Sequence, residues 1–187
     1  MQLSKYFTLA DLTKTDSGIK NVPDAIALEN LKKFAKIADV VYDTIGPFSF
    51  LSAYRSPAVQ SALKAGSSGA ASALQASTTS YHMKGIAGDI VPKTMTAEAY
   101  MAKIAQNPKI KNMLGEIAVK KNALHISAAT PEKVGVLMYV DNAGKYIRLK
   151  AEEISSMIER HKVAAGIGLG TIIALGIGLY FIMKRRK

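Results

Sequence analysis

The sequence contains no cysteine and no tryptophan, and it has only three histidines among its 187 residues. Without cysteine there can be no disulfide bonds and no thiolate metal sites, so any metal must be held by histidine and carboxylate side chains. The N-terminal stretch MQLSKYFTLADL has no apolar run long enough for a signal peptide. The length suits one domain of ordinary size with a short additional segment.

Acidic residues are scarce relative to basic ones, and the formal net charge is +11. The four residues 184–187 are all basic, so residues 1–162 keep 21 Lys and Arg against 14 Asp and Glu, a formal charge of +7. A basic domain favours anionic surroundings, which include nucleic acid, acidic lipid headgroups and the bacterial cell wall. No nucleic acid partner is expected, because the lysines are not interleaved with aromatic residues and no recognition helix is visible.

One long hydrophobic run lies near the C-terminus, where residues 163–183 carry no charge. About 20 apolar residues are enough for a helix to cross the hydrocarbon core of a lipid bilayer. We therefore predict a single transmembrane helix at 163–183. We also expect a domain at 1–150, a juxtamembrane helix at 151–162 and a basic tail at 184–187.

Local patterns within residues 1–150 predict both helices and strands. An amphipathic helix is expected from Pro23 and Asp24 onward, with an apolar face made of Ile26, Leu31, Phe34, Ala38, Val41 and Ile45. Further along we expect a strand ending at Arg55, a helix at 58–65, a surface loop at 65–79, strands at 87–91 and 123–128, a helix at 96–106 and a hairpin around 141–144.

Three polar residues in these strands and the preceding loop form a candidate metal site. Side chains alternate along a strand, so Asp89 points away from its neighbours in AGDIV, and His125 does the same in ALHIS. If the two strands are adjacent, both groups emerge on one face, and His82 can reach the same point. Two imidazoles and one carboxylate leave a fourth position open, as in catalytic zinc sites. A satisfied or surface histidine is the alternative interpretation of each residue.

Four segments occur in an order that resembles a known family. They are YFTLADLTKTDSGIKNVPDAIALENLKKFA, GPFSFLSAYRSPAVQSAL, SYHMKGIAGDIV and LGEIAVKKNALHIS. The chain resembles the M15 family of zinc peptidases over roughly residues 6–130, and most closely the D-Ala-D-Ala carboxypeptidases and phage endolysins that cleave peptidoglycan peptides. The resemblance implies an α+β fold with a small central antiparallel sheet, flanking helices and one zinc ion.

The resemblance also implies roles for individual residues. His82, Asp89 and His125 match the zinc ligands. Arg55 matches an arginine that meets the substrate carboxylate or the developing oxyanion, and its planar fork suits that task better than lysine. Ser80 matches a serine that orients the first ligand or contacts substrate. Glu116 matches the general base, which would take a proton from water and pass it to the leaving amine.

One departure from the family pattern leaves the function open between alternatives. Many members of the family have an acidic residue three positions before the last ligand, where this chain has Asn122. A structural protein that keeps the peptidase fold without activity is therefore the alternative to an active enzyme. A basic membrane-bound adaptor for nucleic acid or lipid is a third hypothesis, and it predicts salt-dependent binding that a chelator does not affect.

The membrane anchor constrains where such a domain acts. The positive-inside rule would keep the basic tail in the cytoplasm and send the large domain across the membrane without a signal peptide. The opposite topology would leave a wall hydrolase on the wrong side. A lipid-containing bacteriophage resolves the conflict, with the protein in the virion's internal membrane or the host inner membrane during entry or lysis. The G-x-x-x-G spacing of Gly166 and Gly170 permits close packing against another helix, although membrane spans also simply tolerate glycine. Contacts with capsid proteins are a further expectation for a virion protein.

Overall fold

The structure is a computed structural model that describes residues 1–65 and 80–162. The chain divides into two compact units, the first spanning Met1–Leu149 and the second beginning at Lys150. The predicted transmembrane helix at 163–183, the basic tail and all but the first residue of the predicted loop at 65–79 lie outside the described residues. None of the helices within the described ranges is both long and apolar enough to span a bilayer.

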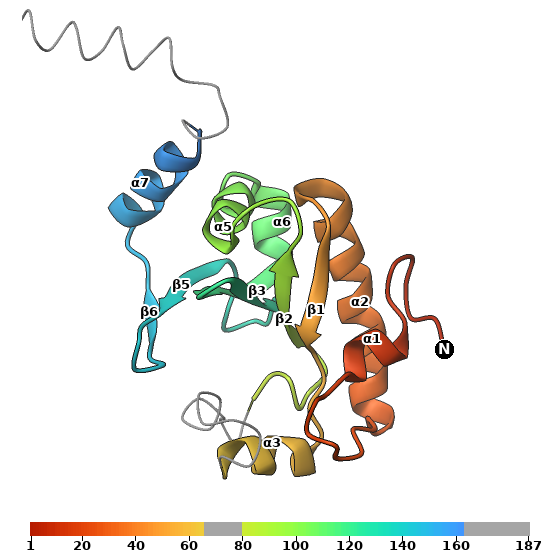
Figure 1. Ribbon diagram of the computed structural model, residues 1–187. Helices are drawn as coiled ribbons and strands as arrows, with labels where there is room; N and C mark the ends of the chain where they lie inside the picture. The colour runs from red at the N-terminus through yellow and green to blue at the C-terminus, as the bar shows by residue number, and fades with distance from the viewer. Residues whose placement is uncertain (66–79, 163–187) are drawn as a thin grey trace, which may run out of the picture. The chain divides into compact units, whose positions relative to one another are not determined.

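The first unit is an α+β fold built on a six-stranded sheet with flanking helices, as predicted (Figure 1). The strands lie in the order β1-β2-β4-β3-β5-β6. Their bounds are β1 Phe48–Ser52, β2 Ala87–Pro92, β3 Leu114–Lys120, β4 Ala123–Ala128, β5 Val136–Val140 and β6 Tyr146–Arg148.

The sheet is mixed rather than purely antiparallel, which corrects the expectation from the sequence. Strands β3 and β5 run parallel, whereas all other neighbours are antiparallel. The connection that follows β4 passes the N-terminal end of β3, so that β5 joins the other edge of β3 and runs in the same direction. The backbone N–H of Gly135 donates to the carbonyl of Leu114 at 2.7 Å and holds this connection against the start of β3.

The helices of the first unit are α1 Leu9–Thr13, α2 Ala25–Ile45, α3 Pro57–Lys64, α5 Ala97–Ala105 and α6 Pro108–Met113. Helices α2, α5 and α6 contact one another and the central strands, and they cover one face of the sheet (Figure 1). In the second unit, α7 Ala151–Lys162 occupies the residues where a juxtamembrane helix is expected.

Helix α2 begins at Ala25, so that Pro23 lies before the helix and not in its first turn, and it buries a slightly different face than predicted. Asp24 is the N-cap and accepts a hydrogen bond from the N–H of Ala27 at 2.8 Å. Ile26 is 76% exposed, against the prediction that it belongs to the apolar face, while Ala27 is buried. Ala27 lies four residues before the buried Leu31 and so shares its side of the helix, whereas Ile26 is rotated away from it.

Strand β1 is shorter than the sequence suggests, because it ends at Ser52 rather than Arg55. The chain leaves the sheet there, and its next backbone N–H groups bind other segments. Tyr54 donates to the carbonyl of Leu12 at 2.7 Å, and Arg55 donates to the carbonyl of His82 at 3.3 Å. These bonds bring the Arg55 segment next to the loop that carries His82.

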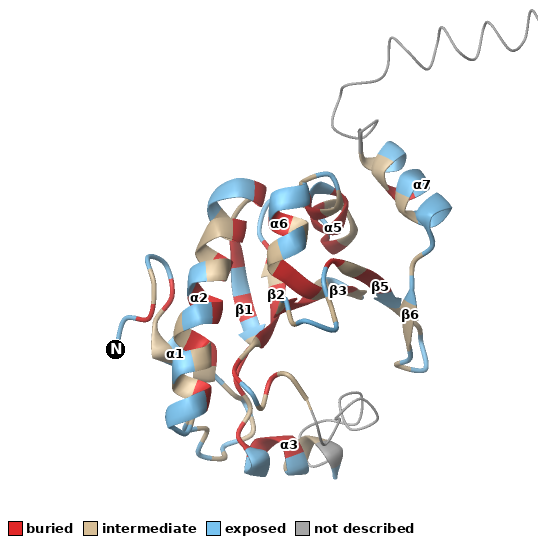
Figure 2. Ribbon diagram, turned by 180° about the vertical axis from the view of Figure 1, so that it is seen from behind, coloured by how far each residue is buried: buried red, intermediate tan, exposed pale blue. Residues whose placement is uncertain are grey.

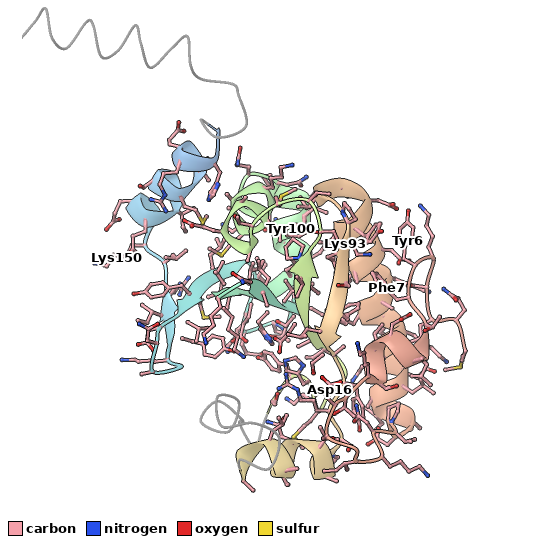
Figure 3. All side chains as sticks on the ribbon, viewed as in Figure 1. Tyr6, Phe7, Asp16, Lys93, Tyr100 and Lys150 are labelled. Atoms are coloured by element: carbon pink, nitrogen blue, oxygen red, sulfur yellow. The ribbon has the colours of Figure 1, made fainter. Side chains whose placement is uncertain are left out.

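The core lies between the helices and the sheet, where buried residues line the strands and the inner side of α2 (Figure 2). Aromatic side chains pack at the β1 edge, where the rings of Phe7 and Phe48 stack with centroids 5.4 Å apart. The buried Tyr100 donates its hydroxyl to the carbonyl of Gly46 at 2.7 Å (Figure 3). This well-packed face fixes the strands and leaves the opposite face of the sheet to present polar side chains.

Candidate metal centre

Strands β2 and β4 are neighbours, and they pair Asp89 directly with His125. A Cβ atom on Gly88 would meet the rings of Phe50 and Phe34, so Gly88 faces the helices and the adjacent Asp89 faces the other way. His82 reaches the same point from the turn before β2. The clustering predicted from strand alternation is therefore present, and all three side chains are buried.

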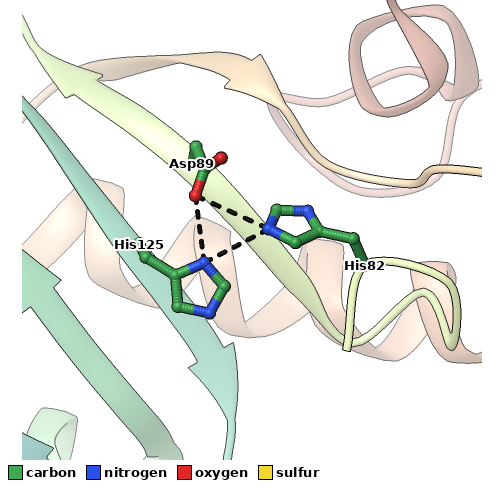
Figure 4. Close-up of side chains that lie close together, drawn as sticks. All are labelled: His82, Asp89 and His125. Atoms are coloured by element: carbon green, nitrogen blue, oxygen red, sulfur yellow. Dashed lines mark hydrogen bonds and ion pairs between the residues drawn. The ribbon is translucent and has the colours of Figure 1, made fainter. Parts of the chain in front are cut away.

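The three side chains converge on one small volume (Figure 4). His125 Nδ1 lies 2.9 Å from Asp89 Oδ1 and 3.2 Å from His82 Nε2, and His82 Nε2 lies 3.5 Å from Asp89 Oδ1. Atoms bound at about 2.1 Å around a tetrahedral ion are roughly 3.4 Å apart. The observed separations are close to that value, so this buried His-Asp-His group could hold a metal ion.

A backbone hydrogen bond orients His82 for this purpose. Its Nδ1 lies 2.5 Å from the carbonyl oxygen of Ala53, which can only accept, so Nδ1 carries the proton. The lone pair of His82 is then on Nε2 and points into the cluster. A hydrogen bond of this kind from the outer ring nitrogen fixes the tautomer and orientation of metal-binding histidines.

Burial and charge determine the protonation of the cluster. Burial lowers the pKa of His82 to about 4, an effect that Asp89 opposes and Arg55 reinforces. Burial alone would raise the pKa of the Asp89 carboxyl, but the interactions with His82 and His125 outweigh it and hold that pKa well below its usual range. At neutral pH the site therefore presents a neutral His82 and an ionised Asp89, the forms that bind cations.

Arg55 is engaged with the cluster itself. Its Nη2 forms an ion pair with Asp89 Oδ2 at 2.7 Å, and its Nε donates to Ser52 Oγ at 3.0 Å. The structure thus brings Arg55 to the predicted site, where it holds the carboxylate oxygen that does not face the two histidines. Such a contact orients a ligating carboxylate.

Glu116 lies on the other side of His125 from the cluster. Its Oε2 is 3.8 Å from His125 Nε2, whereas Nδ1 is the ring nitrogen that faces Asp89 and His82. Its Oε1 forms a close ion pair with Lys133. The hydrogen bond to Glu116 is the main reason that the pKa of Lys133 is raised. The carboxylate therefore contacts the outer nitrogen of a candidate ligand and shares its charge with a lysine.

The cluster opens into a cleft of about 1020 Å³ with many basic residues in its walls. Its cationic side chains are Lys14, Arg55, Lys84, Lys120, Lys121 and Lys133. Ser80 also lines this cleft, and its Oγ accepts a hydrogen bond from the backbone N–H of His82 at 3.3 Å. Asn122 is exposed in the turn between β3 and β4 and is not among the residues lining the cleft.

Several site residues were not predicted from the sequence. Lys133 and Tyr146 both line the cleft, and the Tyr146 ring meets the His125 ring edge-on at 6.3 Å. Ser127 fixes the backbone of Glu116, whose N–H donates to Ser127 Oγ at 2.9 Å. The hairpin prediction places Tyr146 on a strand, and the alternation rule applied there would have indicated its face.

Gly85 allows the His82 turn to approach α2 closely. Its φ is +71°, and a Cβ atom there would lie 2.5 Å from the carbonyl oxygen of Ala27. A side chain at this position would be strained in conformation and would also clash with the helix backbone. The glycine therefore fixes the depth at which His82 enters the site.

No protein family model matches the chain. No curated protein is similar enough to be counted as a relative. The geometry of the buried cluster and its cleft is thus the main evidence for what the protein does.

Proposed function

We propose that this chain is a membrane-anchored, zinc-dependent peptidase that cleaves peptidoglycan peptides and belongs to a lipid-containing bacteriophage particle, where it acts in entry or lysis. The observation that supports it most is the convergence of His82 Nε2, His125 Nδ1 and Asp89 Oδ1 in a buried site. Because Nδ1 of His82 donates to a carbonyl, the lone pair of the neutral imidazole is on Nε2, which faces Asp89 and His125. A bound cation would satisfy the remaining lone pairs.

The donor set suits zinc, which favours imidazole nitrogen and carboxylate oxygen in tetrahedral geometry. When bound, zinc would polarise a peptide carbonyl and lower the pKa of water towards 7, the chemistry that amide hydrolysis requires. His82, Asp89 and His125 would hold it, and Arg55 would keep Asp89 ionised and oriented. The M15-like order of sequence motifs leads to the same residues.

Glu116 is the proposed general base, which accepts a proton from the attacking water and returns it to the leaving amine. General acid-base catalysis contributes about 10²- to 10⁴-fold. We expect Glu116→Gln to lower wall hydrolysis by at least about 100-fold while zinc affinity changes less than about tenfold. The contact with His125 Nε2 offers another role, orientation of that ligand. A zinc affinity that falls by about 10- to 100-fold in Glu116→Gln would assign Glu116 to that role instead.

The basic cleft and the predicted anchor agree with a bacterial wall substrate. The cleft is lined by six cationic side chains and by four acidic ones, Asp16, Asp89, Glu116 and Asp141, and six minus four leaves a formal charge of +2 that favours anionic peptides such as those of peptidoglycan. The hydrophobic run at 163–183 would hold the domain at a membrane. We expect the full chain to stay in the membrane pellet after an alkaline wash and a chain truncated after residue 162 to be released.

The direct test is hydrolysis of purified cell walls by the full chain in detergent, with and without chelator. About one zinc per chain is expected, together with release of peptides or D-alanine that stops when the chelator removes the metal. The variants His82→Gln and His125→Gln should lose zinc. The variant His161→Gln should keep it, because His161 is the one histidine of the chain that is not a proposed ligand. No hydrolysis of several wall types by the zinc-loaded chain would overturn the proposal.

A second candidate is a structural virion membrane protein with the peptidase fold but no activity. Two observations favour it: Glu116 is paired with Lys133, and Asn122 replaces the acidic residue common before the last ligand. This candidate predicts normal zinc content without hydrolysis, or a cluster that binds no metal at all. Metal analysis of intact particles combined with the wall assay separates the two.

A further inference from the structure

Tyr146 belongs to the outermost strand of the sheet, yet its ring reaches the candidate metal centre. Strands β3 and β5 separate β6 from β4, but the rings of Tyr146 and His125 lie 6.3 Å apart with their planes at 82°. The register explains the direction. Ala118 is paired with both His125 and Met138, and Tyr146 is paired with Val140, two residues beyond Met138. Side chains two apart share a face, so Tyr146 points to the face that carries the cluster.

The phenol group of Tyr146 is a hydrogen-bond donor at the site. Within the described ranges no hydrogen bond is formed by its hydroxyl, although the side chain lines the cleft. Burial raises the pKa of Tyr146 to about 12, with further increases from the charges of Asp89 and Glu116 and a decrease from Arg55. The hydroxyl is therefore protonated at neutral pH.

Arg55 and Lys133 each already hold an internal acceptor at the site. Arg55 uses Nη2 on Asp89 and Nε on Ser52, and Lys133 is paired with Glu116. A substrate oxygen that gains negative charge would share these groups with their internal partners. The Tyr146 hydroxyl can donate without breaking any of them.

We propose that Tyr146 is a catalytic residue whose hydroxyl donates a hydrogen bond to the oxygen of a ligand bound at the His82, Asp89 and His125 centre. This inference rests on the proposed function, and in the reaction the ligand is a peptide whose carbonyl oxygen becomes an oxyanion. The proton stays on the phenol throughout, so no bond of Tyr146 is made or broken. Removing one donor of this type lowers kcat by about 10²- to 10³-fold.

The test compares Tyr146→Phe with the unaltered full chain in detergent micelles. The variant removes only the hydroxyl and keeps the ring that packs on His125. Tyr139→Phe is the matched control, because Tyr139 lies on β5, pairs with Val119 and Ile147, and is 38% exposed. Each chain is loaded with cobalt(II), which reports its coordination in the visible spectrum, and is titrated with methylphosphonate, a tetrahedral oxyanion.

We expect all three chains to bind cobalt with equal affinity and to melt at similar temperatures. Methylphosphonate should bind Tyr146→Phe at least about tenfold more weakly than the unaltered chain or Tyr139→Phe. With zinc and cell walls, kcat of Tyr146→Phe should fall by about 100-fold with little change in KM.

The outcomes distinguish this inference from the proposed function. Equal affinity of Tyr146→Phe and the unaltered chain for methylphosphonate would overturn the role of the hydroxyl alone. Weaker cobalt binding by Tyr146→Phe would also overturn it, because the residue would then support the metal ligands and not the bound oxygen. If the unaltered chain binds no cobalt, the proposed function fails and this inference fails with it.

Discussion

Acidification should destabilise the metal-free protein in a pH range that His82 determines. In the folded protein burial lowers the pKa of His82 from 6.5 to about 4, so between these values the unfolded chain binds more protons than the folded one. Stability is therefore complete above about pH 6.5 and falls as the pH decreases towards 4. A shift of this size corresponds to about 3 kcal/mol, since one pKa unit is about 1.4 kcal/mol.

The assay is urea unfolding of residues 1–162, stripped of metal, at several pH values between 7 and 4. The control is His82→Gln, which removes this titrating group and keeps the other two side chains of the cluster. Asp89 does not interfere, because its pKa is held below the usual range and its contribution is lost only below about pH 4. The free energy of unfolding should fall by about 3 kcal/mol more in the unaltered chain than in His82→Gln. Parallel curves would show that His82 is not held neutral by burial.

Three further substitutions test the supports of the site. Gly85→Ala should lower the free energy of unfolding by more than about 1 kcal/mol and weaken zinc binding, because φ is +71° and the Ala27 carbonyl would be only 2.5 Å from the new Cβ; an unchanged urea midpoint would contradict this. Lys121→Gly should raise the melting temperature slightly in differential scanning calorimetry, since Lys121 has a φ of +53° and a non-glycine residue in that conformation costs about 1 kcal/mol or more; a lower melting temperature would contradict this. Arg55→Lys should weaken zinc binding about tenfold in a competition titration, because lysine cannot hold Asp89 and Ser52 together; equal affinity would show that this contact does not orient the carboxylate.

Local patterns in the sequence were enough to identify the candidate ligands. Asp89 and His125 each interrupt an apolar strand segment, and alternation alone predicts that both emerge on one face if the strands are adjacent. The capping residue Asp24 and the period of α2 likewise depend on neighbours a few residues away. Strand β3 was not predicted, because burial on both of its faces removes the alternation of polar and apolar residues.

Only the tertiary structure decided what surrounds the ligands. The position of Glu116 beside the outer nitrogen of His125, the ion pairs of Arg55 and Lys133, and the approach of Tyr146 from β6 all depend on strand order and on the parallel pairing of β3 with β5. These contacts join residues far apart in the chain, and no short-range spacing encodes them. The sequence by itself thus determined which residues can bind a cation, whereas the packing of the sheet determined the tautomer of His82, the charges of the cluster and the side chains that surround it.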